Sequence, residues 1–125
     1  MGIFQKADLF FANLSGADLS GANFCEADFG NANLSKANLS NANLSGADLN
    51  TANLNVANLR GVKFIETKLI GANFEEANLT NADITNADFF YSVFGNTILS
   101  KIDIRKTRRL ENIRHNSPST IGTDT

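Results

Sequence analysis

The sequence contains one cysteine and one histidine, the residue types that often serve as nucleophile and general base. No base recurs near Cys25, and His115 lies beside Arg114 with Glu111 and Asp124 as its nearest acids along the chain. Glycines occur singly, and no phosphate-binding loop of the GxxxxGK type is present. We therefore expect no enzyme, with no catalytic, cofactor-binding or metal-ligating residues; Cys25 is expected to be a free structural thiol and His115 a solvated surface residue.

Carboxylates recur at a spacing that could build a charged surface. Asp8, Asp28, Asp48 and Asp88 are separated by multiples of twenty residues, and Lys68 holds the position that they skip. Such a spacing brings side chains together only if the chain turns with a matching period. The elements that carry these residues decide whether they form one surface.

A five-residue repeat runs through most of the chain. One large apolar residue, which we call the central residue, occurs at every fifth position, and in most blocks Ala stands two residues before it. The central residues are Phe4, Leu9, Leu14, Leu19, Phe24, Phe29, Leu34, Leu39, Leu44, Leu49, Leu54, Leu59, Phe64, Leu69, Phe74, Leu79, Ile84, Phe89, Phe94, Leu99 and Ile104.

A period of five fits neither a continuous α-helix nor a continuous strand. On a helix the central residues would wander around the axis, and on a strand they would alternate between opposite faces. The remaining positions are rich in Asn, Asp, Gly and Ser, which favour turns. Each block therefore predicts a short extended segment and a corner, with the central residue and the preceding Ala facing inward.

The A-[DN]-L-x-x pattern of residues 2–104 resembles the pentapeptide-repeat family. The resemblance implies an all-β solenoid, a right-handed quadrilateral β-helix with four blocks per coil and a type II or type IV turn at each corner. On this chain it implies about five coils, in which residues twenty apart stack in columns. The interior is then filled by side chains, which leaves no internal ligand cavity.

These columns define a candidate interaction surface. Stacked carboxylates repel unless they are hydrogen-bonded or screened, so we expect the aspartates to accept hydrogen bonds at their corners, with an acidic surface for a basic partner as the sharper alternative. Four aromatic residues outside the inward positions share two further columns, where we expect them to cover an edge or to self-associate. The candidate residues are Asp8, Asp28, Asp48, Asp88, Phe10, Phe11, Phe90 and Tyr91.

The two ends of the repeat carry different expectations. Residues 1–104 form the predicted β-helix, residues 105–115 a short helical or turn cap in which Leu110 and Ile113 share one face, and residues 116–125 a flexible tail. At the other end, Ile3 and Phe4 have no preceding segment to cover them, which makes that end a candidate contact site. An open solenoid end also favours self-association.

Composition and charge restrict the classes of partner. Residues 1–100 carry a net charge of −5 and residues 101–115 a net charge of +4. The chain shows no secretory signal and no apolar run long enough for a bilayer, so we expect a cytoplasmic protein with no membrane partner. The basic segment lacks interleaved aromatics, and direct nucleic-acid binding is not expected.

The sequence favours a non-catalytic structural or protein-interaction module whose partner is another protein. One alternative is a DNA-mimicking inhibitor of DNA gyrase, a function of one branch of the pentapeptide-repeat family; the mild acidity and the basic C-terminal segment weigh against it. Further alternatives are a regulatory protein that acts by binding other proteins, or a repeat module of a larger protein. The repeat pattern does not separate these alternatives from the first.

Overall fold

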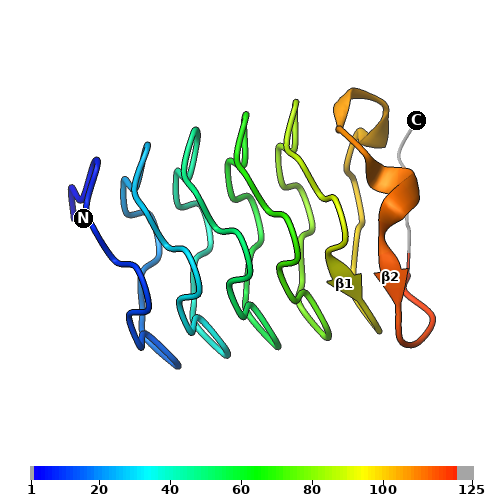
Figure 1. The fold of residues 1–125 in the computed structure, drawn as a ribbon, viewed down its shortest axis with the longest axis horizontal. Coiled ribbons are helices and arrows are strands. Elements are labelled where there is room, and N and C mark those ends of the chain that lie inside the picture. Colours follow the sequence, from blue (N-terminus) through cyan, green and yellow to red (C-terminus); the bar gives the residue numbers. More distant parts are fainter. Residues whose placement is uncertain (1, 121–125) are drawn as a thin grey trace.

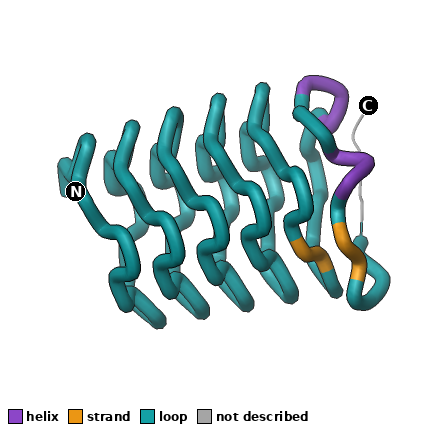
Figure 2. The backbone as a smooth tube through the Cα atoms, in the orientation of Figure 1, coloured by secondary structure: helices purple, strands orange, loops and turns teal. Residues whose placement is uncertain are grey.

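The computed structural model describes residues 2–120. The backbone winds as a stack of similar coils around one long axis (Figure 1). Strand β1 (Val93–Phe94) pairs in parallel with β2 (Arg114–His115), and the 3-10 helices η1 (Ile104–Lys106) and η2 (Leu110–Asn112) lie at the C-terminal end. Elsewhere the straight segments are so short that parallel pairing occurs as single bridges (Figure 2). Over the described residues, no helix has the length and apolar character needed to cross a membrane.

The coil advances by twenty residues. Parallel bridges from Ile3–Asn23 through Asn78–Ile98 each join a residue to the one twenty positions later. At each bridge the backbone donates in both directions along the stack; for example, the Phe4 N–H donates to the Asn23 carbonyl at 2.7 Å, and the Asn23 N–H donates to the Gly2 carbonyl at 2.9 Å. Four blocks per coil, as the family resemblance implied, are therefore confirmed.

Each block ends in a tight turn. In most blocks the N–H three residues after a central residue donates back to its carbonyl, as Ala57 does to Leu54 at 3.0 Å; after Phe94, the Thr97 N–H donates instead to Ser119 Oγ. The residue two positions after each central residue has positive φ, at every fifth position from Lys6 to Lys101. A hydrogen-bonded turn with positive φ only at its third residue is the type II pattern, so the predicted corners are confirmed.

The side chains of the central residues fill the interior. Those from Phe24 to Leu99 are at most 5% exposed, and the alanines between them are buried as well. Burial of each large side chain contributes on the order of 1.5–3 kcal/mol. In the first coil Phe4 is 46% exposed and Ile3 is 78% exposed, so the apolar N-terminal end predicted from the sequence is observed.

Polar residues in the inward alanine position are satisfied by the backbone. Thr67 and Thr97 are buried, and their hydroxyls donate to the carbonyls of Leu44 and Phe74, each at 2.8 Å. Ser92 is also buried and donates to the Phe89 carbonyl at 2.8 Å. Because a buried hydroxyl without a partner costs about 1–3 kcal/mol, these bonds explain why the repeat tolerates hydroxyl residues there.

The C-terminal segment forms a further, irregular coil on the stack. Asp88 bridges to Arg108 at the usual spacing of twenty, but Val93 pairs with Arg114 and Ile98 with Thr120, so two extra residues are accommodated. The first extra residue falls where η2 forms. The spacing of Leu110 and Ile113 predicted that both lie on one face, and in the structure both pack against the core.

The predicted flexible tail has backbone partners over its first five residues. The Asn116 N–H donates to the Phe94 carbonyl and the Thr120 N–H to the Thr97 carbonyl, each at 2.9 Å. The sequence did not predict this pairing, because the two inserted residues shift the chain out of the five-residue repeat. Residues 121–125 of the predicted tail lie outside the described residues.

Candidate interaction surface

The aspartates and asparagines before the central residues build the corners. In most blocks the side-chain Oδ1 accepts a hydrogen bond from the N–H two residues later. The bond is 2.8 Å at Asp28 and 2.9 Å at Asp48, and Asn53 makes the same bond at 3.0 Å. Either residue type closes the turn, as predicted, so only the choice of Asp over Asn adds charge to the surface.

The four predicted aspartates lie in one file along the stack. Bridges join Asp8 to Asp28 and Asp28 to Asp48, and these three residues form what we call the acidic stripe. Lys68 follows them and separates Asp48 from Asp88, and Arg108 comes next. The file is therefore negative in its N-terminal half and alternates in sign beyond it.

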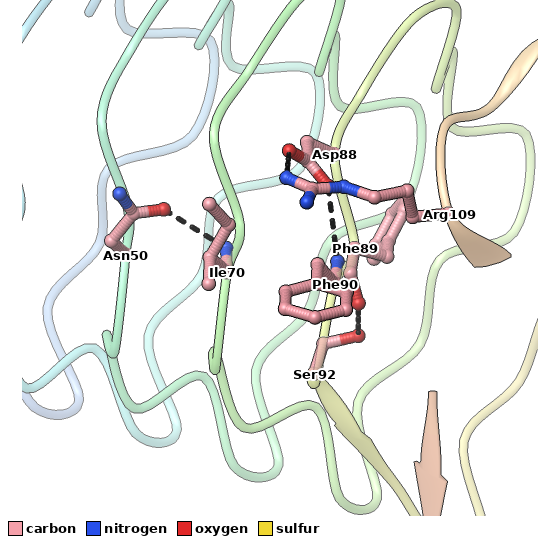
Figure 3. Close-up of polar contacts among 7 residues, drawn as sticks. All are labelled: Asn50, Ile70, Asp88, Phe89, Phe90, Ser92 and Arg109. Atoms are coloured by element: carbon pink, nitrogen blue, oxygen red, sulfur yellow. Dashed lines mark hydrogen bonds and ion pairs between the residues drawn. The ribbon is translucent and has the colours of Figure 1, made fainter. Parts of the chain in front are cut away.

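A neighbouring coil compensates for the missing acceptor at Lys68. An Asp or Asn at position 68 would accept a hydrogen bond from the Ile70 N–H. This N–H donates instead to Asn50 Oδ1 at 2.9 Å (Figure 3). Asn50 lies one coil earlier in the same column. The repeat pattern did not indicate this role of Asn50, although the spacing of twenty between Asn50 and Ile70 is a signal for it.

Asp88 differs from the acidic stripe because it is buried and paired. It is 6% exposed, accepts from the Phe90 N–H at 3.1 Å and from Arg109 Nε at 2.9 Å, and forms an ion pair with the same guanidinium (Figure 3). The hydrogen bond from Arg109 lowers the pKa of Asp88 below its ordinary value, against the opposing effect of burial. The Arg109 guanidinium also lies 4.4 Å from the centre of the Phe90 ring. Asp88 therefore fastens the last coil to the repeat, a role that the sequence pattern did not predict.

Four aromatic residues, of which Phe90 is half-buried beneath Arg109, form two pairs on one corner, which we call the aromatic corner. The Phe10 and Phe11 ring centres are 4.6 Å apart and nearly perpendicular, and the side chains are 51% and 69% exposed. The Phe90 and Tyr91 ring centres are 4.3 Å apart, and Tyr91 is 56% exposed. The two pairs occupy the same columns, four coils apart, as the sequence predicted.

The first aromatic pair packs against the backbone of the next coil. A Cβ at Gly30 would lie only 2.8 Å from the Phe10 ring, so glycine at this position lets the ring lie directly against the backbone. Gly30 is also the residue whose N–H closes the corner at Asp28. The aromatic corner and the acidic stripe are thus adjacent parts of one surface.

Cys25 and His115 are not brought together. Cys25 is a half-buried free thiol on a corner, and His115 is an exposed residue of β2 whose ring centre lies 6.4 Å from that of Phe94. Within residues 2–120, no three His, Cys, Asp or Glu side chains are grouped to hold a metal ion. An apolar recess of 270 Å³ lies between the last regular coil and the C-terminal segment, lined mainly by Phe94, Leu99, Ile104 and the two cap residues Leu110 and Ile113.

The fold and this surface define a class of protein: a right-handed quadrilateral β-helix with a filled interior and polar corners. The sequence signature of pentapeptide repeats matches residues 3–41, 17–55 and 57–94, and the chain belongs to the pentapeptide-repeat family. No curated protein matches the sequence.

Solved structures of the family share this fold. A pentapeptide repeat protein from the thylakoid lumen of Arabidopsis thaliana is 27% identical, with a TM-score of 0.64 over 74% of this chain and 71% of its own. HetL, from the cyanobacterium Nostoc sp. strain PCC 7120, is 27% identical, with a TM-score of 0.58 over 90% of this chain and 56% of its own. A second Nostoc protein, alr5209, is 31% identical over 91% of this chain and 84% of its own, with a TM-score of 0.49.

Proposed function

We propose that this protein is a non-catalytic protein-interaction module. The proposal is carried by the roles of the side chains in this protein. Large apolar residues fill the interior, and most Asp and Asn residues before them close corners. The groups that remain exposed include Asp8 and Asp28 of the acidic stripe and Phe10, Phe11 and Tyr91 of the aromatic corner. Exposed aromatic side chains on a rigid frame are better suited to contact another macromolecule than to perform chemistry.

The frame contributes to binding because it is already ordered. Each coil is held to the next by backbone hydrogen bonds on all four sides, as at Asn33–Asn53 and Asn38–Asn58. A partner that docks on one side therefore meets side chains whose backbone positions are fixed. Little ordering free energy is then lost on association, which favours affinity for a given contact area.

The proposal is tested by capture from native lysate of the source organism, with the purified protein as bait. The wild-type chain is expected to retain a specific protein, and a Phe11→Ser, Tyr91→Ser double variant to lose it. Val56→Ser is the matched control, because Val56 is a 43% exposed apolar residue on a different corner. Retention of the same protein by the double variant would assign binding to another surface, and measured turnover of a substrate would contradict the non-catalytic function.

A regulatory role through protein binding is supported by one comparison. HetL is involved in heterocyst differentiation regulation, and this chain resembles it over 90% of its own length. The chain spans 56% of HetL, so only part of that surface has a counterpart here. A DNA mimic that inhibits gyrase is not favoured, since the file of aspartates changes sign at Lys68 and Arg108.

The proposed cytoplasmic location rests on the sequence alone. The free thiol of Cys25 is compatible with a reducing compartment, whereas the Arabidopsis relative comes from the thylakoid lumen. Fractionation of native cells with an antibody against this chain checks the proposal, and recovery from a membrane or luminal fraction would contradict it.

A further inference from the structure

We propose that the partner of the aromatic corner is a second copy of this chain, bound side by side with the two long axes antiparallel. The proposal rests on the interaction function above and specifies its surface and partner. It is carried by the symmetric placement of two aromatic pairs and by the charge gradient beside them.

The aromatic pairs lie at equal distances from the middle of the corner. Phe10 and Phe11 occupy the first coil and Phe90 and Tyr91 the fifth, so that Asn50 lies midway between them. A two-fold axis through the third coil places the first coil of one copy against the fifth coil of the other. Each copy then sets its first aromatic pair against the second aromatic pair of its neighbour, twice in one interface.

The corner between the two pairs is open enough for close approach. In its two columns the residues between the pairs are Gly30, Asn31, Asn50, Thr51, Ile70 and Gly71. None carries a charge, and the two glycines add no side chain. Two such corners can therefore approach along their length while the aromatic pairs at both ends make the main apolar contacts.

Charge favours the antiparallel arrangement over the parallel one. With parallel axes, each residue of the file lies at the level of its own counterpart in the second copy, so Asp28 and Lys68 are two coils apart and cannot pair. With antiparallel axes through the third coil, Asp28 faces Lys68 of the second copy and Lys68 faces Asp28, while Asp8 faces Asp88, whose charge is already paired with Arg109. Opposite charges therefore meet twice, between the second and the fourth coil, and only Asp48 sets two unpaired carboxylates of the two copies against each other.

The surface is large enough for such a dimer. The described chain has 6295 Å² of accessible surface, so one of its four sides offers on the order of 1,000 Å². A standard interface buries about 800 Å² per partner. A complex that uses one side and one corner is therefore expected to be reversible and dependent on concentration.

The first test is sedimentation equilibrium of the full chain over a range of concentrations. The wild-type chain is expected to show a monomer–dimer equilibrium, and the Phe11→Ser, Tyr91→Ser variant to raise the dissociation constant by at least tenfold. Val56→Ser is expected to leave the dissociation constant unchanged. A wild-type chain that stays monomeric at all concentrations, or a dimer that the double variant does not weaken, would overturn the proposal.

The second test reverses the charges. Lys68→Asp is expected to weaken the dimer and to increase its sensitivity to salt, and adding Asp28→Lys is expected to restore it. Lys68→Asp places a corner acceptor at position 68, whereas Asp28→Lys removes the acceptor of the Gly30 N–H, so Asp28→Lys alone is the stability control. Failure of the second substitution to restore the dimer, with circular dichroism showing both variants folded, would contradict the antiparallel pairing.

Cross-linking settles the direction of the axes. In a Cys25→Ser background, a short bis-maleimide is expected to join two copies of the Thr51→Cys variant, since Thr51 lies beside the two-fold axis. Asn31→Cys is not expected to react with itself, because it faces Gly71 of the second copy. Self-reaction of Asn31→Cys would indicate parallel axes. Capture of a different protein by a monomeric wild-type chain would reject this dimer and leave the interaction function intact.

Discussion

At the scale of the residue, each corner requires a positive φ, and the repeat does not always place there a residue type that favours this conformation. The third turn residue has positive φ at every corner, and glycine or asparagine occupies about half of these positions. Val56 is there instead with φ of 62°, although a branched side chain is strongly disfavoured in this conformation. The stack of hydrogen bonds on both sides holds the corner in place despite this local cost.

Substitution of Val56 measures that cost. Val56→Asn is expected to stabilise the protein by about 1 kcal/mol, because asparagine tolerates positive φ better than valine and Val56 is largely exposed. The reciprocal change is Gly16→Ala in the same column, where φ is 70° and no atom lies within 4 Å of the new Cβ. We expect Gly16→Ala to destabilise by about 1 kcal/mol. Urea unfolding of both variants checks the two signs, and a destabilised Val56→Asn would contradict the account of the corner.

At the scale of the element, the coil depends on its central residue. Leu54 is fully buried between the coils on either side, whereas Leu14 in the same column is only partly buried at the end of the stack. We expect Leu54→Ala to cost about 2–5 kcal/mol of unfolding free energy and Leu14→Ala to cost less. Thermal unfolding of both variants tests this difference. Equal losses would mean that burial at the end of the stack matters as much as burial within it.

The C-terminal coil is fastened by a pair that responds to acid. Because hydrogen bonding to Arg109 lowers the pKa of Asp88 in the folded state, the pair stabilises the protein fully above about pH 4. That stabilisation is lost as the pH falls through the lowered folded-state pKa. Asp88→Asn keeps the acceptor for the Phe90 N–H but removes the charge, so it is expected to lower the Tm by a few degrees at pH 7.

The measurement is the difference in Tm between the wild-type chain and Asp88→Asn as the pH is lowered from 7 to 2. The difference is expected to shrink towards zero, because the wild-type chain loses its charged pair while the variant has none to lose. Other carboxylates titrate in both proteins and largely cancel. A difference that stays constant with pH would show that the loss at neutral pH does not come from the charge of Asp88.

At the scale of the whole molecule, the period of five is sufficient to predict a solenoid but not its cross-section. The inward position of Leu54 and the corner at Gly16 follow from residue types and spacing alone, whereas the four-sided coil came from the family resemblance. The pairing of Asp88 with Arg109 could not be predicted in the same way, because residues 105–115 lack the five-residue pattern that would place Arg109 on a further coil. The role of Asn50 was not predicted for a related reason. Its bond from the Ile70 N–H replaces the bond that an Asp or Asn at position 68 would accept, so the repeat pattern does not indicate it.

The sequence predicted where the residues of the candidate surface lie, but not which of them have a structural role. The positions of the aromatic pairs and of the aspartate file follow directly from a coil of twenty residues. Burial decides whether an aspartate adds charge to the surface or stabilises the fold. Asp88 is buried, which distinguishes it from the acidic stripe. Sequence spacing carries no information on that difference, since all four residues stand in equivalent blocks.

The advance of twenty residues per coil is the geometry on which every stacked pair and the whole interaction surface depend. Cys25 is the only cysteine, so Ser45→Cys places a second thiol one coil later, about 4.8 Å away along the stack and within reach of a disulfide. Mild oxidation of dilute protein, followed by tryptic mass spectrometry, is expected to find the intramolecular disulfide in Ser45→Cys and not in Ser40→Cys, whose thiol lies on another corner. A disulfide that forms equally well in both variants, or only in Ser40→Cys, would contradict the coil.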